Sequence, residues 1–422
     1  MEGPLSVSSR LDDPAVAFNP LDPSFMGDPG ALLAYARREE PVFFSPVVNA
    51  WVLTRYDDVE AVLRDPRRFT SFGTLSITDL LSDPVRELVA ERIPMEGTLV
   101  GLDGEVHARL RRVLNHAFTA QRVRELERDV TELTDSLVSD FRRTGDADLV
   151  ADLCYPLPLW TISRLIGLPD DEVDTFRQGV DDWAELTTAH LFGAPLERQL
   201  FLAQRIISLH DRVEELFEER RREPRNDLLS AIVAREVPDQ LSAREMLSLV
   251  PGLFLAGHET TAQALAMGIY HLLEDRRLWW EIVDDPSRID AVVEELVRRD
   301  AAVFGMWRNV TEDCVIAGTP IPSGSRLYLS FWSANLDETR FEDPLRIDVA
   351  RTGRPHLGFG RGVHHCIGAP LARAEMRVAL STLVRDFPDL RLAREFSPGY
   401  RPHFFLRGIE RLDVTSITYF TR

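Results

Sequence analysis

Apolar residues recur every three or four positions through most of this chain, which is the period of amphipathic helices. Between Arg122 and Glu223 the pattern is almost continuous. Breaks that contain glycine or proline fall near Gly145, Pro156–Pro158, Gly167–Pro169 and Gly193–Pro195. Core packing alone explains these stripes, so this region predicts a series of packed helices.

The longest apolar helix is predicted to run from Ser242 to about Asp275. Ser242 and Glu245 have the spacing of a capping box, in which each side chain accepts from the other residue's backbone N–H. Pro251 and Gly252 predict a kink or a disturbed turn early in this helix. A helix of this length and apolarity is typical of the centre of a large helical fold.

Short alternating segments predict a small amount of β-structure. The expected strands are Val42–Phe44, Trp51–Thr54, Cys314–Ala317 and Arg326–Phe331, and the last two flank a turn at Pro322–Gly324. A small closing sheet is expected beyond Arg391, where the chain ends in SITYF and two further residues.

Other segments are assigned from their turn residues and caps. Residues 1–28 read as an extended lead-in, 29–40 as a short helix, and Asp57 as the cap of the helix that follows it. Residues 71–100 are irregular, and so long a loop is usually a lid or a binding loop. The fold class is therefore mostly α with a small β subdomain. One domain over residues 1–422 would be large, and a buried cofactor would account for its size.

Composition excludes several classes of function. The formal net charge is −19 and the sequence pI is about 5.0, which argues against binding nucleic acid or an anionic membrane surface. No uncharged apolar run reaches the roughly 20 residues that span a bilayer, and the N-terminus has no signal pattern. Only three cysteines are present, too few for a disulfide framework, so a soluble cytoplasmic protein is expected.

The stretch HLGFGRGVHHCIGAPLAR, residues 356–373, contains the strongest candidate for a metal-ligating residue, Cys366. Gly358, Gly360, Gly362 and Gly368 surround Cys366 and let the backbone approach a flat object closely. A helix predicted from Ala369 to Leu383 would place its positive end beside the sulfur and favour the thiolate. Three alternative interpretations of the stretch are a buried inert cysteine, a zinc site and a dinucleotide-binding loop. Adjacent histidines are poorly placed around zinc, and the dinucleotide pattern fails at Val363.

The pattern Phe359-Gly360-x-Gly362-x-His364-x-Cys366-x-Gly368 resembles the haem-binding loop of the cytochromes P450. The resemblance implies that Cys366 is the axial ligand of haem b and that Phe359 shields its sulfur. It also implies that Gly360 and Gly368 shape the loop and that His364 meets a haem propionate. Thiolate ligation supplies the electron density that favours O–O cleavage.

A polar segment interrupts the long apolar helix at Ala256-Gly257-His258-Glu259-Thr260-Thr261. A threonine hydroxyl bonding back to a carbonyl one turn earlier would explain it without any function. The segment also resembles the oxygen-activating motif of the same family. That resemblance implies that Glu259 and Thr260 organise water and deliver protons, and that Ala256 and Gly257 leave room for dioxygen.

Three further patterns match the family. His107 and Arg111 stand four apart and, with Arg308, resemble its propionate-binding residues, although Arg111 alone reads as a surface residue. Glu295 and Arg298 would otherwise be a surface ion pair. With Arg351, they match a structural triad of the family, in which Ile347 replaces a frequent phenylalanine.

The resemblance implies a haem-dependent monooxygenase of the soluble bacterial type. One oxygen atom of dioxygen would enter a substrate by hydroxylation, epoxidation or oxidative demethylation, in secondary metabolism or catabolism. Electrons would come from a separate ferredoxin and its reductase, docking near Arg112 and Arg361. Two alternatives are a peroxide-driven peroxygenase, which typically lacks the acid–threonine pair, and a non-catalytic haem-binding sensor.

No family motif describes the substrate pocket, so its lining is argued from apolar positions near the motifs. The residues expected to line it are Leu253, Phe254, Ala256, Ala302, Val303, Phe304 and Met306. Such a lining predicts a neutral, mainly apolar substrate. Polar recognition is assigned to Ser76, Thr78 and Glu96 in the 71–100 segment.

Overall fold

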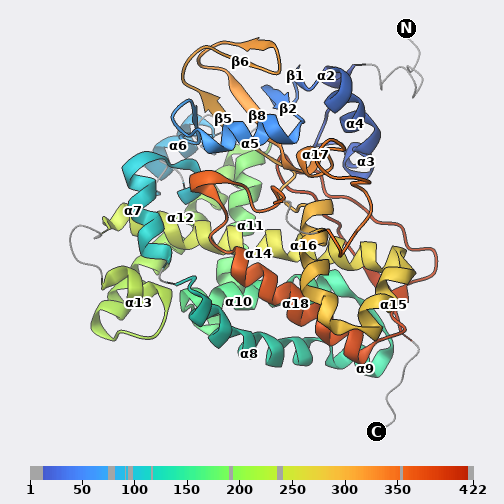
Figure 1. Cartoon of the computed structure of the whole chain (residues 1–422). Coiled ribbons are helices and arrows are strands. Elements are labelled where there is room, and N and C mark those ends of the chain that lie inside the picture. The colour runs from blue at the N-terminus through green and yellow to red at the C-terminus, as the bar shows by residue number, and fades with distance from the viewer. Residues whose placement is uncertain are drawn as a thin grey trace. The chain divides into compact units, whose positions relative to one another are not determined.

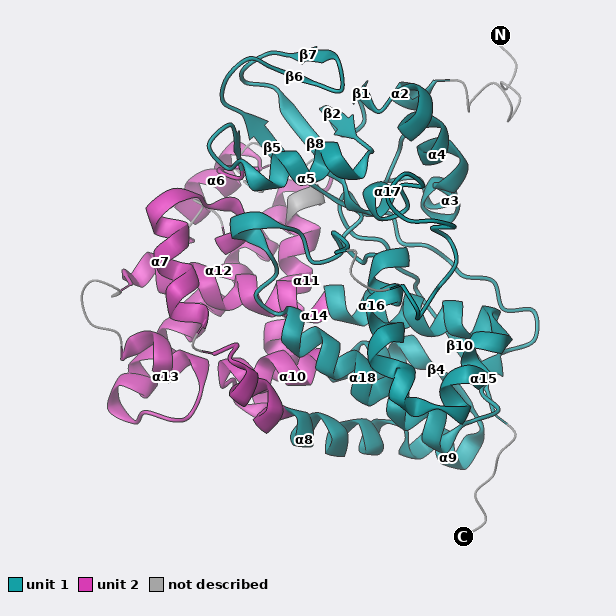
Figure 2. Cartoon of the chain, viewed as in Figure 1, with its two compact units in different colours: residues 1–70, 127–157, 260–422 teal, residues 71–126, 158–259 magenta. Residues whose placement is uncertain are grey.

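The structure is a computed structural model, and it describes residues 13–74, 81–90, 92–93, 98–115, 117–189, 193–234, 241–351 and 355–416. The chain forms two compact units, each built from several segments (Figure 2). Unit 1 comprises residues 1–70, 127–157 and 260–422, and unit 2 comprises residues 71–126 and 158–259. The boundary falls within the helices α8 (Ala120–Leu137), α10 (Pro156–Ile166) and α14 (Ala243–Glu274).

All the strands of the described chain belong to unit 1. The largest sheet has the order β1 (Val42–Ser45), β2 (Ala50–Leu53), β8 (Arg326–Ser330), β5 (Gly305–Val310), β3 (Phe69–Thr70) (Figure 1). Only β2 and β8 run parallel, with Val52 opposite Tyr328. A three-stranded sheet has the order β4 (Asp146–Asp148), β10 (Asp413–Thr415), β9 (Arg391–Leu392), and β6 (Cys314–Ile316) pairs with β7 (Thr319–Ile321).

The other helices of unit 1 are α2 (Pro14–Ala17), α3 (Pro23–Gly27), α4 (Gly30–Glu39), α5 (Tyr56–Arg64), α9 (Ser139–Thr144), η3 (Val150–Cys154), α15 (Arg276–Asp284), η5 (Pro286–Arg288), α16 (Ile289–Arg299), α17 (Phe331–Asn335), η6 (Gly362–His364) and α18 (Ala369–Asp386). A core of Leu, Ile, Val and aromatic side chains is formed mainly by α9, η3, α15, α16 and α18 together with α8 and α14. Helices α15, α16 and α18 lie side by side (Figure 1). Trp279 of α15 is fully buried there, and its indole N–H donates to the carbonyl oxygen of Pro388 at 2.8 Å.

The described part of unit 2 is helical. Its elements are α6 (Asp83–Ala90), η2 (Leu99–Gly101), α7 (Gly104–Asn115), η4 (Asp170–Glu172), α11 (Val173–Ala189), α12 (Leu196–Arg222) and α13 (Leu228–Val233). Helix α6 corrects the expectation that 71–100 is irregular throughout. Val85 and Val89 lie one turn apart and pack into an apolar cluster with Leu202 and Ile206 of α12, which stabilises this helix. No helix among the described residues is long and apolar enough to cross a membrane.

The capping box at the start of α14 is confirmed. The backbone N–H of Ser242 donates to Glu245 Oε2 at 2.8 Å, and that of Glu245 donates to Ser242 Oγ at 3.3 Å. Helix α14 continues through Pro251 and, at 32 residues, is the longest in the described chain.

Two local predictions are corrected. Asp57 lies within the first turn of α5, and the N–H of Tyr56 is capped instead by Asp337 Oδ2 at 2.9 Å. Strand β6 pairs with β7 through a turn at Ala317 and Gly318, and β8 pairs with β5 and β2. The small sheet expected beyond Arg391 is present as β9 and β10 paired with β4, and residues 417–420 of the SITYF segment lie outside the described residues.

Candidate functional site

The cysteine loop of unit 1 ends at the N-terminus of α18. Cys366 is exposed and lies two residues before Gly368, the N-cap of this helix. The N–H of Cys366 donates to the carbonyl oxygen of Phe359 at 2.9 Å, which closes the loop behind the cysteine. Gly360 and Gly362 have φ of 66° and 70°, values that favour glycine. A Cβ on Gly362 would lie 2.4 Å from the carbonyl oxygen of Leu63, so this glycine lets the loop pack closely against α5. The predicted approach of the loop to a flat group stays a prediction.

Polar side chains from distant segments hold the start of this loop. Asn335 Oδ1 accepts from the N–H of Leu357 at 2.6 Å, and the hydroxyl of Tyr56 donates to the carbonyl oxygen of Pro355 at 2.6 Å. A Cβ on Gly358 would lie 2.7 Å from the carbonyl oxygen of Val297 in α16. The loop is therefore fixed on several sides before any ligand binds.

Glu295, Arg298 and Arg351 come together as one buried cluster. Arg298 donates from Nε to Glu295 Oε1 at 2.7 Å and from a terminal nitrogen to Oε2 at 3.0 Å. Arg351 Nε donates to Glu295 Oε2 at 3.2 Å. The side chains of Glu295 and Arg298 are 6% and 1% exposed, so this is not the ordinary surface ion pair that their spacing alone would suggest.

Arg298 also ties down the segment that precedes the cysteine loop. Its terminal nitrogens donate to the carbonyl oxygens of Asn335, Pro344 and Arg346 at 3.0, 2.8 and 3.0 Å. Since Asn335 also bonds to Leu357, the same network reaches the first residues of the loop. Ile347, where the family often has phenylalanine, is buried in the core of unit 1.

The cationic residues predicted to meet propionates are divided between the units. Unit 1 carries Arg308 in β5, which is 5% exposed and donates to the carbonyl oxygen of Trp307 at 2.6 Å, and His364, which is half-buried in η6. Unit 2 carries His107, which is buried in α7, and Arg111, which is half-buried one turn later. Three of the four side chains come from regular elements of four or more residues, so their backbones are well fixed.

The polar segment of α14 has a small exposed residue beside two half-buried polar ones. Ala256 is exposed although it lies in the middle of an apolar helix, and Glu259 and Thr260 are half-buried. Gly257 does not leave open space, because a Cβ there would lie 2.8 Å from Ile162 Cδ1 of α10. Helix packing within unit 2 explains the glycine, and the role expected for Ala256 stays a prediction.

The donor set fits a haem group better than a metal ion held by protein ligands alone. No group of three or more His, Cys, Asp or Glu residues in the described chain could hold a metal ion. An exposed single thiol close to a helix N-terminus, in a glycine-rich loop, matches a cofactor that needs one protein ligand and a flat approach. None of the three cysteines forms a disulfide.

Comparison with known proteins identifies the family. A sequence profile described as Cytochrome P450 matches residues 171–283 and 287–395, more than half of the chain. The chain is a member of the cytochrome P450 family. These enzymes are haem-thiolate monooxygenases, so the activity class and the fold class predicted from the motifs are both confirmed.

Two curated relatives and one solved structure illustrate the range of this P450's neighbours. Cytochrome P450 107B1 of Saccharopolyspora erythraea is 36% identical over 396 residues, covering 90% of this chain and 93% of the relative. Mycinamicin IV hydroxylase/epoxidase of Micromonospora griseorubida is 38% identical over 373 residues, covering 87% and 89%. The structure of CYP109E1 from Bacillus megaterium in complex with testosterone has a TM-score of 0.80 at 26% identity, covering 94% and 100%.

Two of the residues expected to line the substrate pocket of this P450 are corrected. Phe304 has no exposed surface and packs against Phe18, Phe25 and Trp332, with ring centroids 5.9 to 6.3 Å apart. Phe254 is likewise fully buried, 6.1 Å from the ring of Phe176. A side chain without accessible surface cannot border an open cavity, so both are packing residues in this structure.

The remaining expected lining residues differ in exposure. Val303 forms an isolated antiparallel bridge with Leu406 and is half-buried. Its side chain therefore points away from that of Phe304, because successive side chains of extended chain alternate in direction. Leu253, Ala302 and Met306 are 8%, 8% and 9% exposed. Ser76, Thr78 and Glu96 lie outside the described residues.

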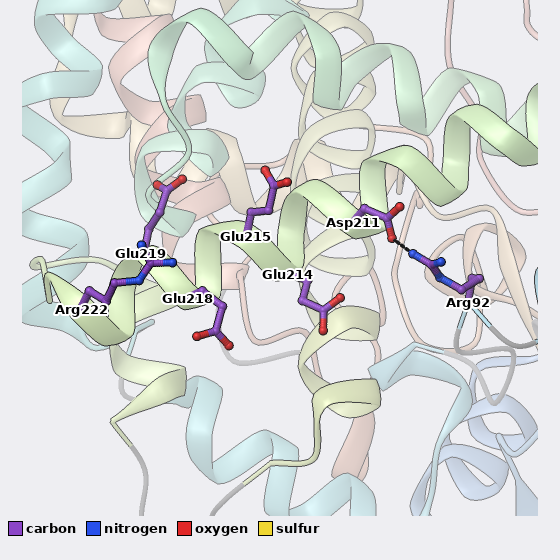
Figure 3. A pocket seen from close by; sticks show the side chains of 7 residues that line it. All are labelled: Arg92, Asp211, Glu214, Glu215, Glu218, Glu219 and Arg222. Carbon is purple, nitrogen blue, oxygen red and sulfur yellow. Dashed lines mark hydrogen bonds and ion pairs between the residues drawn. The ribbon is translucent and has the colours of Figure 1, made fainter.

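A surface hollow of about 560 Å³ in unit 2 is unrelated to the motifs (Figure 3). It is lined by Arg92, Asp211, Glu214, Glu215, Glu218, Glu219 and Arg222. Its charges largely pair with arginines: Asp211 with Arg92, and both Glu215 and Glu219 with Arg212 at 2.9 Å. Ligand pockets are mostly apolar, so this hollow does not correspond to the predicted substrate site.

Sequence reasoning missed the residues that hold the cysteine loop. Asn335 and Tyr56 belong to no recognisable motif, and their bonds reach Leu357 and Pro355, 22 and 299 positions away. Both side chains are fully buried in the structure, where an amide or a phenol needs a partner, but no sequence pattern marks them. Glu294, which contacts His356 and Arg373, stands next to Glu295 and has no motif of its own.

Proposed function

We propose that this P450 binds haem b through the thiolate of Cys366. It then inserts one oxygen atom of dioxygen into a mainly apolar organic molecule. Two electrons and two protons reduce the other oxygen atom to water. The exposed thiol of Cys366 at the N-terminus of α18, in a loop anchored by Asn335 and Tyr56, is the observation that carries the proposal. When bound, the haem supplies dioxygen binding and activation.

His107, Arg111, Arg308 and His364 would neutralise the haem propionates. Arg308 is suited to this role because its guanidinium is buried, and water screens the attraction between a buried cation and a carboxylate less than at the surface. The paired hydrogen bonds of a guanidinium also match the geometry of a carboxylate.

Glu259 and Thr260 would hold and move protons during turnover. Both are half-buried on α14, so a proton can reach the carboxyl oxygens of Glu259 from solvent and pass to water held by the Thr260 hydroxyl. Exposed Ala256, one turn earlier, supplies a helix surface without bulk for dioxygen.

A separate ferredoxin and its reductase would deliver the electrons. The three cysteines of the chain are one fewer than an iron–sulfur cluster commonly uses. Exposed Arg112, together with Arg361 at 24% side-chain exposure, would provide cationic contacts for an acidic partner. The prediction of a single cytoplasmic domain over residues 1–422 is retained as part of this proposal.

The substrate would be neutral and mainly apolar. Val303, Leu253, Ala302 and Met306 have accessible apolar surface, and burying apolar area contributes roughly 25 cal/mol per Å². One relative is named a mycinamicin IV hydroxylase/epoxidase, and the structure of CYP109E1 is a complex with testosterone, so both neighbours support a small organic substrate. The reaction would be a hydroxylation, an epoxidation or an oxidative demethylation, in biosynthesis or catabolism.

The decisive test is the spectrum of the reduced carbon monoxide complex. Cys366→Ala is expected to abolish the thiolate-type band, whereas Cys314→Ala, in strand β6, is expected to keep it. A thiolate-type band that survives in Cys366→Ala would refute the ligation. Screening compounds for shifts of the ferric haem spectrum then identifies the substrate class.

A further inference from the structure

A second charged cluster lies beside the cysteine loop in unit 1, separate from the Glu295 triad. The guanidinium carbon of Arg373 lies 4.4 Å from the centre of the Phe359 ring. Arg373 donates from a terminal nitrogen to Glu294 Oε2 at 3.0 Å and from Nε to Glu294 Oε1, so the pair is bidentate. Glu294 lies on α16 and Arg373 on α18.

His356 completes the cluster and fixes its hydrogen-bond directions. Its Nδ1 accepts from the N–H of Gly358 at 3.1 Å, so in the neutral ring the proton is on Nε2. That Nε2 lies 3.2 Å from Glu294 Oε2 and donates to it. The imidazole also lies 5.8 Å from the Phe359 ring, centre to centre.

This arrangement is more ordered than a typical surface ion pair, which contributes little. Burial alone would raise the pKa of Glu294, but hydrogen bonds from His356 and Arg373 lower it to about 2. The carboxylate is thus a fixed anion that aims the guanidinium at the ring face, where the negative charge of the π-system attracts a cation.

We infer that Arg373 is a positioning residue for Phe359 and that its charge raises the reduction potential of the haem group bound at Cys366. The inference rests on the proposed ligation. Phe359 is bonded to Cys366 through the backbone, so a cation stacked on its ring acts close to the ligand. Reduction adds one negative charge to the site, and a nearby fixed cation favours the reduced state while the Glu294 anion opposes it.

The test is an equilibrium redox titration of the holoenzyme without substrate. Arg373→Leu is expected to lower the ferrous-to-ferric ratio at a given potential at least about threefold, an order-of-magnitude figure for one charge. At 59 mV per tenfold for one electron, this is a shift of about 28 mV to more negative potential. Glu294→Gln is expected to shift the potential in the opposite direction, and Arg373→Lys to recover most of the parent value.

Arg377→Leu is the matched control. Arg377 lies one turn further along α18, is 33% exposed against 34% for Arg373, and is also paired with carboxylates, Glu127 at 2.8 Å and Asp290 at 3.4 Å. It is expected to change the potential by less than half as much as Arg373→Leu. An equal shift in both leucine variants would overturn the inference.

The directions of the shifts separate an electrostatic role from a merely structural one. If Arg373→Leu and Glu294→Gln shift the potential in the same direction, or neither shifts it, the inference is wrong. If Arg373→Leu does not retain haem, the Lys and Gln variants, which preserve size, decide the question. A parent enzyme without a thiolate-type carbon monoxide band would instead refute the proposed ligation itself, independently of Arg373.

Discussion

Replacing Arg298 by methionine should destabilise the region that leads into the cysteine loop. The substitution keeps an unbranched chain of similar length but removes five hydrogen bonds: two to Glu295 and three to backbone carbonyl oxygens. It also removes a cation that lies 5.3 Å from the centre of the Phe341 ring.

The expected magnitude follows from what remains around Glu295. Breaking a buried ion pair by removing one partner typically costs about 3–5 kcal/mol, because the other charge stays buried without compensation. Here Glu295 Oε2 still accepts from Arg351 at 3.2 Å and from the N–H of Asp348 at 2.9 Å. We therefore expect a loss near the lower end, about 3 kcal/mol in the free energy of unfolding.

Urea unfolding of the holoenzyme, followed by far-UV circular dichroism and by the carbon monoxide band, measures this loss. Arg277→Met is the control, because Arg277 is 56% exposed and pairs with Glu281 at the surface of α15. That variant should lose less than about 1 kcal/mol. If Arg298→Met is no more destabilising than Arg277→Met, the buried network does not hold the loop.

Three further predictions concern the relay, the aromatic core and pH. Thr260→Ala should still bind substrate and accept electrons but form product roughly tenfold less efficiently, with the electrons recovered as hydrogen peroxide; unchanged product per electron would make Thr260 only a helix residue. Phe304→Ala should cost about 3–5 kcal/mol in unfolding free energy while leaving the affinity of spectral ligands unchanged, and weakened ligand binding at full stability would restore its pocket role. Burial lowers the pKa of His403 to about 4, against about 6.5 when unfolded, so stability falls by up to about 3 kcal/mol as pH drops from 6.5 to 4. His403→Asn, which keeps an acceptor for the N–H of Phe405, should flatten that pH dependence in urea titrations, and an unchanged slope would contradict it.

Local chemistry predicted the long elements of this fold well. The capping box of Ser242 and Glu245 predicts the start of α14. The change from a glycine-rich to an apolar, helix-forming composition after Gly368 predicts α18. The β6–β7 hairpin was missed because its turn uses Ala317 at a φ of 47°, a conformation that alanine rarely adopts. Pro322 and Gly324 carried the stronger turn signal, yet β8 takes its partners from β2 and β5.

The site was only partly predictable for a related reason. Glycine spacing specifies the path of the cysteine loop, because a positive φ at Gly360 and Gly362 leaves few other residues possible. Position along the chain does not specify whether a side chain faces the core or accessible space. Val303 and Phe304 are neighbours, but one is half-buried and the other lies in an aromatic core, and nothing in their order reveals which.

Helix α16 explains how one element can control both ends of the cysteine loop. Glu295 and Arg298 hold the segment before the loop, and Val297 packs against Gly358 inside it. Glu294 binds Arg373 beyond the cysteine, on α18. Successive residues on a helix point about 100° apart, so two adjacent carboxylates serve two different networks without competing for the same partners. Exchanging Glu295 for glutamine should therefore alter the segment before the loop and leave the contact between Arg373 and Phe359 unchanged.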